Sequence, residues 1–101
     1  MFKVHASASS YTNTIYIVFD SKEYIDRYEL YRDGVKIADS GFVRPFMFDH
    51  DHHTNLFRKE SNHKLMYEDI DVAKFREYSY YVKYYSRENS WNSNTVYVTL
   101  Q

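Results

Sequence analysis

The chain has 101 residues, which is enough for one domain with one hydrophobic core. Its net charge of −1 leaves no basic surface of the kind that binds nucleic acid, and no apolar run is long enough to span a membrane. The absence of cysteine excludes disulfides, thiol nucleophiles and thiolate metal sites, while aromatic residues make up 20% of the chain, with 12 tyrosines among them.

The first half of the chain reads as short β-strands. Residues 2–9 alternate apolar and polar side chains, as a strand with one buried face does. Residues 14–19 are β-branched and aromatic, and residues 26–32 alternate again. An Asp-Gly pair at 33–34 is a strong turn signal, and residues 35–38 form the predicted return strand.

Three more strands are predicted at 65–70, 77–86 and 95–100. Seven short strands without a predicted helix are typical of an antiparallel sandwich or barrel. We therefore expect one all-β domain over residues 1–101, a seven- or eight-stranded antiparallel β-sandwich.

The segment 40–64 is long for a loop in a compact domain and has the character of an insertion. Residues 41–48 could form an eighth strand, which Pro45 would confine to an edge or a bulge. The same segment holds the only histidine cluster, in the stretch DHDHH at 49–53. Imidazole and carboxylate ligands suit zinc or nickel, so the candidate ligands are His50, His52 and His53, with His63 across the loop. The alternative is a solvated polar loop, and no cofactor is otherwise expected.

The order of these elements resembles a fibronectin type III domain of the bacterial or phage type. The resemblance lies in YELYRDGVKIA (28–38), YEDIDVAKFREYSYYV (67–82) and SWNSNTVYVTL (90–100). It implies an immunoglobulin-like sandwich in which Tyr78 is the tyrosine-corner residue, its hydroxyl bonded back to the preceding loop. Phe75 stands where the family usually has a glycine.

Strand parity then divides the tyrosines. If Tyr78 points inward, so do Tyr80, Val82 and Tyr84. In a fibronectin type III sheet the third, sixth and seventh strands are neighbours, so one outer face should carry four tyrosines: Tyr31, Tyr81, Tyr85 and Tyr97. Such a face suits a protein interface, including self-association as a homodimer. Cross-strand pairing that only stabilises the sheet is the other interpretation.

Trp91 is predicted in the loop before the last strand, either exposed as a contact residue or folded back over the end of the sandwich. We expect a non-enzymatic binding module, since no catalytic motif is present. A carbohydrate-binding accessory module with coplanar exposed rings is the alternative. The N-terminus shows no signal peptide. The compartment stays open: an intracellular or virion-associated protein and an excised domain of a secreted or surface protein are both consistent.

Overall fold

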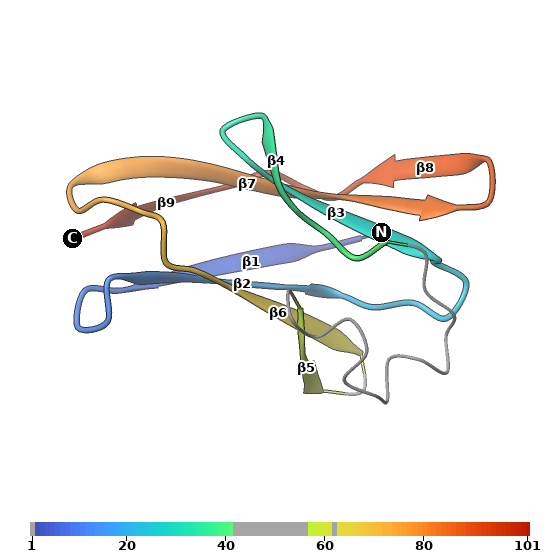
Figure 1. Cartoon of the computed structure of the whole chain (residues 1–101), viewed down its shortest axis with the longest axis horizontal. Helices are drawn as coiled ribbons and strands as arrows, with labels where there is room; N and C mark the ends of the chain where they lie inside the picture. The colour runs from blue at the N-terminus through green and yellow to red at the C-terminus, as the bar shows by residue number, and fades with distance from the viewer. Residues whose placement is uncertain (1, 42–56, 62) are drawn as a thin grey trace.

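The structure is a computed structural model that describes residues 2–41, 57–61 and 63–101, and none of these residues is helical (Figure 1). The described strands are, in chain order, β1 (Val4–Ser9), β2 (Thr14–Asp20), β3 (Arg27–Arg32), β4 (Val35–Asp39), β5 (Arg58–Ser61), β6 (Lys64–Asp69), β7 (Arg76–Ser86), β8 (Asn89–Asn92) and β9 (Val96–Leu100). They form two stacked antiparallel sheets, and the fold is therefore an all-β sandwich.

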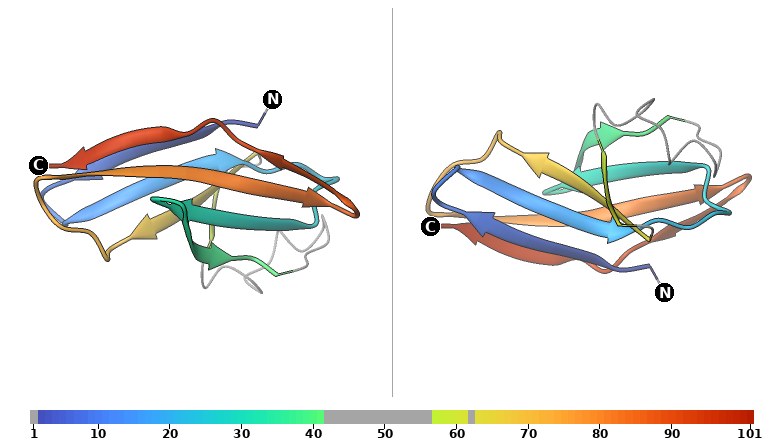
Figure 2. Two further views of the ribbon diagram at one scale, coloured as in Figure 1. Left: turned by 90° about the horizontal axis from the view of Figure 1, so that it is seen from above. Right: turned by 90° about the horizontal axis from the view of Figure 1, so that it is seen from below.

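Sheet A has the strand order β1-β2-β6-β5, and sheet B has the order β4-β3-β7 with β8 and β9 following one another along the far edge of β7. Figure 2 shows sheet B from above and sheet A from below. The long strand β7 is central because it pairs with β3 on one side and with β8 and β9 on the other. This arrangement leaves β4 at one edge of sheet B and β8 with β9 at the other.

The core lies between the sheets and is built by alternation along each strand. The inward positions predicted on β7 are confirmed, because Tyr78, Tyr80, Val82 and Tyr84 are all buried. They join a core cluster with buried side chains of both sheets, Ile15, Ile17 and Phe19 from sheet A and Tyr28, Leu30 and Leu100 from sheet B. Rings contribute much of this packing, as in the edge-to-face pair of Tyr28 and Tyr84 with centroids 5.3 Å apart.

The connection between β6 and β7 contains a residue with a strained backbone, Phe75, at the position where the resemblance would expect a glycine. Phe75 has φ 63, in the left-handed region that glycine adopts without steric strain. Its N–H donates a hydrogen bond to the Leu100 carbonyl at 2.5 Å, which holds the start of β7 against the end of β9. Phe75 is 82% exposed, so the packing of its side chain does not offset the energetic cost of the strained backbone.

All seven predicted strands are confirmed, with ends that shift by one or two residues. Two strands were not expected: β5, inside the segment 40–64, and β8, where a loop was predicted. The possible strand at 41–48 lies almost entirely outside the described residues. The described part of the long segment therefore contributes the short strand β5 to the edge of sheet A.

Candidate functional site

The outer side of sheet B carries a group of side chains that we call the tyrosine face: Tyr31, Tyr81, Tyr85 and Tyr97, with Glu29 and Lys83 between them. They occupy the strand positions that alternate with the core residues. Tyr31 of β3 lies directly opposite Tyr81 of β7, and Tyr97 of β9 lies opposite Ser79, two residues before Tyr81. The face therefore extends over three neighbouring strands.

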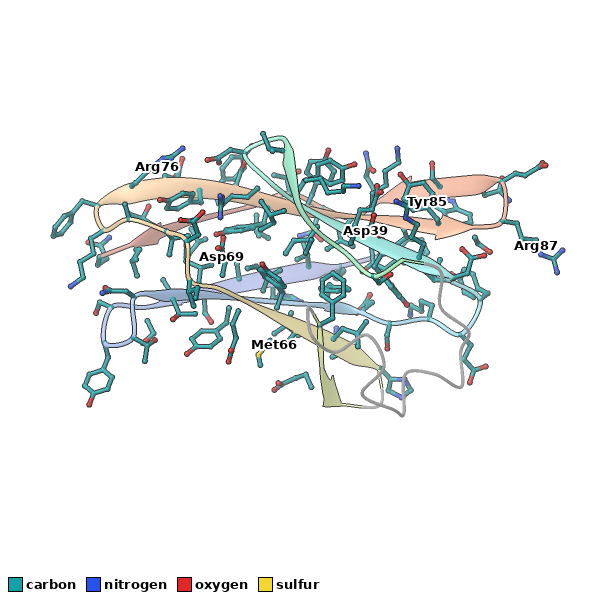
Figure 3. All side chains as sticks on the ribbon, viewed as in Figure 1. Asp39, Met66, Asp69, Arg76, Tyr85 and Arg87 are labelled. Carbon is teal, nitrogen blue, oxygen red and sulfur yellow. The ribbon has the colours of Figure 1, made fainter. Side chains whose placement is uncertain are left out.

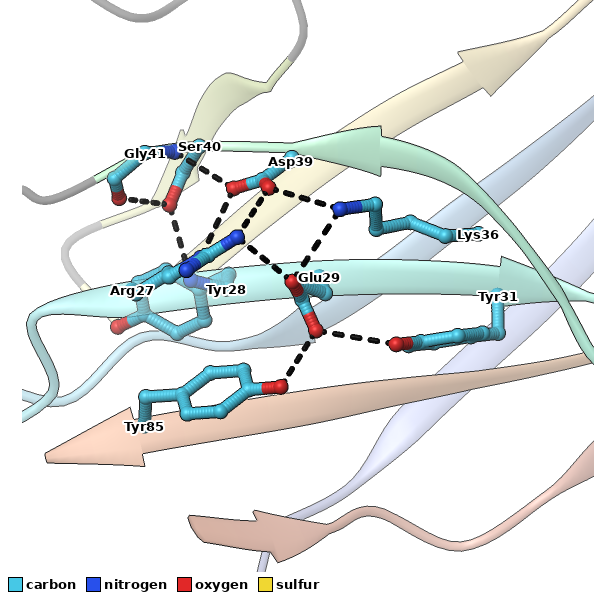
Figure 4. A network of polar contacts seen from close by, with 9 residues as sticks. All are labelled: Arg27, Tyr28, Glu29, Tyr31, Lys36, Asp39, Ser40, Gly41 and Tyr85. Atoms are coloured by element: carbon cyan, nitrogen blue, oxygen red, sulfur yellow. Dashed lines mark hydrogen bonds and ion pairs between the residues drawn. The ribbon is translucent and has the colours of Figure 1, made fainter. Parts of the chain in front are cut away.

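A buried carboxylate organises one side of this face (Figure 4). Glu29 Oε1 accepts hydrogen bonds from the Tyr31 hydroxyl at 3.0 Å and from the Tyr85 hydroxyl at 2.6 Å. Its Oε2 lies 2.8 Å from Arg27 Nη2 and 3.4 Å from Lys36 Nζ. Although Glu29 points away from the core, it is only 4% exposed, because its partners cover it. The arrangement satisfies both carboxylate oxygens and fixes two tyrosine rings.

Asp39 of the edge strand β4 completes the network. Arg27 donates to it in a bidentate geometry, from Nε to Oδ1 at 3.2 Å and from Nη2 to Oδ2 at 2.6 Å. The Gly41 N–H also donates to Asp39 Oδ1, at 2.8 Å. The hydrogen bond from Arg27 is the main reason why the pKa of Asp39 is lowered to about 2. The edge strand is therefore tied to β3 by charged contacts as well as by its backbone ladder.

The pKa values in the network keep the carboxylate charged and the hydroxyls protonated. Burial alone would raise the pKa of Glu29, but hydrogen bonds from Tyr85 and Tyr31 and the charge of Arg27 outweigh it, so the pKa is lowered. Burial, and then the bond to Glu29, raise the pKa of Tyr31 to about 12. The bond to Glu29 also raises the pKa of Tyr85. Near neutral pH both hydroxyls therefore act as donors to a carboxylate.

The rings of the face pair across the strands. Tyr31 and Tyr81 stack with parallel planes and centroids 4.8 Å apart. Two cations lie near the Tyr85 ring, with Arg27 Cζ at 5.4 Å and Lys83 Nζ at 5.3 Å from its centroid. Three of the four predicted tyrosines thus hold one another and the sheet in place. Cross-strand stabilisation of the sheet was one of the two roles that the sequence predicted for these tyrosines, and a protein interface was the other.

Two groups on the face remain available to another molecule. Tyr97 is 68% exposed. In the described part of the chain, the hydroxyls of Tyr81 and Tyr97 make no hydrogen bond. The face therefore has a rigid, charged side around Glu29, and beside it the Tyr81 and Tyr97 hydroxyls, which have no hydrogen-bond partner among the described residues.

Trp91 lies on β8 and not in a loop, so that prediction was wrong. It pairs with Tyr84, a core residue, and hence lies on the inner side of sheet B, away from the tyrosine face. It packs against Phe2 at 5.7 Å and Tyr24 at 6.4 Å, and it remains 39% exposed. The planes of Tyr24 and Trp91 are 86° apart. This pair therefore lacks the coplanar rings that would favour carbohydrate binding.

Tyr78 is buried, and its hydroxyl accepts a hydrogen bond from the Ala73 N–H at 2.6 Å. Ala73 belongs to the loop before β7, and the tyrosine-corner prediction expects the Tyr78 hydroxyl to bond to the backbone of this loop. Beside it, buried Asp69 accepts hydrogen bonds from the Tyr80 hydroxyl at 2.7 Å and from Arg32 at 2.9 Å. Figure 3 shows Asp69 at the end of β6, between the two sheets. These contacts connect the sheets and have a structural role.

The predicted metal ligands His50, His52 and His53 lie outside the described residues. His63 is exposed at the turn between β5 and β6. Within residues 2–41, 57–61 and 63–101 no group of three potential metal ligands comes together.

Sequence reasoning missed the network around Glu29, including Arg27, Lys36 and Asp39. A signal was present in RYELYR, where Arg27, Glu29 and Tyr31 share one side of a strand. Charges interleaved with tyrosines on an outward face indicate cross-strand ion pairs as well as contact residues.

No segment of the described chain forms a helix long and apolar enough to cross a membrane. Comparison with protein-family models, with curated proteins and with solved structures finds no match to this chain.

Proposed function

We propose that this chain is a non-enzymatic binding module of the fibronectin type III kind, which recognises a protein partner through the tyrosine face. Two features support the family. The strand orders β1-β2-β6-β5 and β4-β3-β7 followed by β8 and β9 resemble the two sheets of an immunoglobulin-like sandwich, with two additional strands, β4 and β8, in sheet B. Tyr78 also makes the hydrogen bond expected of a tyrosine corner.

The observation that carries the function is the buried Glu29, which organises one side of the tyrosine face. It fixes Tyr31 and Tyr85 through their hydroxyls, and Tyr31 in turn supports Tyr81 by stacking. Rings that are immobilised before binding lose less conformational entropy when a partner arrives. Tyrosine also contributes large contact area with a polar tip, which is why it is common in protein-binding surfaces.

The test compares two pairs of tyrosines on opposite sheets. Tyr81→Ser with Tyr97→Ser removes the open phenols of the face, whereas Tyr11→Ser with Tyr16→Ser removes an exposed tyrosine from the β1–β2 turn and one from β2. Proteins captured from source-cell extract by the wild type would be purified, and their dissociation constants measured for each variant.

We expect the first variant to weaken binding at least about tenfold, which corresponds to about 1.4 kcal/mol. The second variant should bind like the wild type, and both should unfold cooperatively. Unchanged affinity in the first variant, with loss in the second, would place the contact surface elsewhere.

A further inference from the structure

The outer edge of β8 offers unpaired backbone groups. The Ser93 N–H donates to the Val82 carbonyl at 2.8 Å, so residue 93 faces β7. Backbone groups alternate sides along an antiparallel strand, and Trp91 and Asn89 therefore also face β7. The N–H and C=O groups of Ser90 and Asn92 consequently point away from β7, toward the open edge of sheet B.

The neighbouring strand β9 is protected where β8 is not. At Asn94, between the two strands, the side chain imitates a paired strand: its Oδ1 accepts from the Val4 N–H at 2.8 Å, and its Nδ2 donates to the Val4 carbonyl at 3.1 Å. This contact brings β1 alongside β9. Among the described residues no strand pairs with the outer edge of β8.

Apart from its length of four residues, the edge lacks the features that usually prevent edge-to-edge pairing. Natural edge strands are very short, carry lysine, proline or an inward charge, or contain a bulge. The four residues of β8, Asn-Ser-Trp-Asn, are uncharged, contain no proline and are all exposed. Their paired residues on β7 run from Lys83 to Ser86 without a bulge. The edge is therefore free of bulges, neutral and accessible.

We propose that β8 pairs with β8 of a second copy of this chain in an antiparallel, two-fold symmetric contact. Antiparallel pairing centred on Trp91 places Ser90 opposite Asn92 of the second copy, and the reverse. Both residues present their N–H and C=O groups outward, so this register forms four backbone hydrogen bonds. Registers centred on Ser90 or Asn92 bring together only one outward-facing residue from each copy, and hence two hydrogen bonds.

A second copy fits this edge better than an unrelated strand because the edge is complementary to itself. The two Trp91 residues face one another at the symmetry axis as a non-hydrogen-bonded pair, where side chains approach most closely. The charged residues of the turn, Arg87 and Glu88, lie opposite residues 95 and 94 of the second copy. No like charges therefore meet. The contact is separate from the tyrosine face, which points out of the plane of the sheet.

Cysteine cross-linking tests both the pairing and its register. The chain has no cysteine, so Trp91→Cys introduces a single thiol at the axis. The Cα atoms of a non-hydrogen-bonded pair are about 4.5 Å apart, within the range that a disulfide spans. We expect the oxidised Trp91→Cys variant to run mainly as a covalent dimer. The control Tyr97→Cys, exposed on β9, should remain largely monomeric. Equal cross-linking of both variants, or of neither, would overturn the proposal.

Introduced charges test self-pairing without removing the tryptophan. Ser90→Lys with Asn92→Lys, and Ser90→Glu with Asn92→Glu, each place like charges opposite one another in a homodimer. Sedimentation equilibrium should show a wild-type dimer, two monomeric variants, and a dimer again when the two variants are mixed. Dimer formation should also shift the emission of Trp91, the only tryptophan, to shorter wavelength. A monomeric wild type at all concentrations, or a mixture of the two variants that stays monomeric, would overturn the proposed contact. Either result would also be expected if the β8 edge pairs with a strand of a different protein.

Discussion

Replacing Glu29 with glutamine removes the negative charge toward which two tyrosine hydroxyls and Arg27 are oriented. A hydrogen bond to a charged group contributes roughly 1.5–3 kcal/mol and a neutral one about 1 kcal/mol. Glutamine retains an acceptor oxygen, so we expect the loss to be about 1 kcal/mol for each tyrosine bond. Weaker pairing with the cations adds to this, for a total of about 2–3 kcal/mol in the free energy of unfolding.

A double-mutant cycle isolates the tyrosine bond from other effects of the substitution. Tyr85→Phe removes the hydroxyl that lies 2.6 Å from Glu29, whereas Tyr81→Phe removes a hydroxyl that does not bond to it. We expect a coupling energy of about 1 kcal/mol between Glu29→Gln and Tyr85→Phe, and less than about 0.3 kcal/mol between Glu29→Gln and Tyr81→Phe. Urea unfolding followed by far-ultraviolet circular dichroism measures both. Equal coupling for the two tyrosines would show that Glu29 does not hold the face through its hydroxyl bonds.

Three further predictions concern charge, hydroxyl groups and backbone strain. Because Asp39 has a pKa of about 2 in the fold against 3.8 otherwise, its stabilisation is present above about pH 4 and is lost as the pH falls toward 2. Urea unfolding should show Asp39→Asn to be destabilising by at most about 2.5 kcal/mol at pH 7 and far less at pH 2. Tyr78→Phe leaves the Ala73 N–H without its partner and should lower the free energy of unfolding by roughly 1–3 kcal/mol. The Tyr84 hydroxyl has no hydrogen-bond partner among the described residues, so Tyr84→Phe should change the urea midpoint little. Phe75→Gly relieves the left-handed backbone strain of an exposed residue and should stabilise the fold by about 0.5–1 kcal/mol, seen as a higher melting temperature. A lower melting temperature would show that the Phe75 ring itself stabilises the loop.

Periodicity predicted the core well because alternation and burial have the same cause. The pattern at 77–86 identified which tyrosines of β7 lie inside, since a period of two fixes the side of every residue once one is placed. The strand β8 was missed because Asn-Ser-Trp-Asn has no apolar alternation and owes its conformation to a two-residue turn and the ladder with β7. Local composition does not contain that long-range pairing.

The tyrosine face was predicted as a set of outward rings, but not as a network. Sequence parity places Glu29 and Tyr85 on the same side of two strands, yet it does not give the register between the strands. Only the register brings their side chains within 2.6 Å. Trp91 was predicted in a loop because β8 was missed, and its pairing with Tyr84 places it on the side of the sheet opposite the tyrosine face.

The two proposed surfaces reinforce one another through the geometry of the sheet. In an antiparallel pair, opposite residues point to the same side, so pairing through β8 would continue sheet B into the second copy with both tyrosine faces directed the same way. A partner that displays its epitope more than once could then occupy both faces, with a gain in apparent affinity of about 10²–10⁴-fold and no new contact. The Ser90→Lys, Asn92→Lys variant should accordingly lose this gain on a multivalent partner while it keeps the affinity for a single epitope. Loss of both affinities would instead mean that β8 belongs to the binding surface itself.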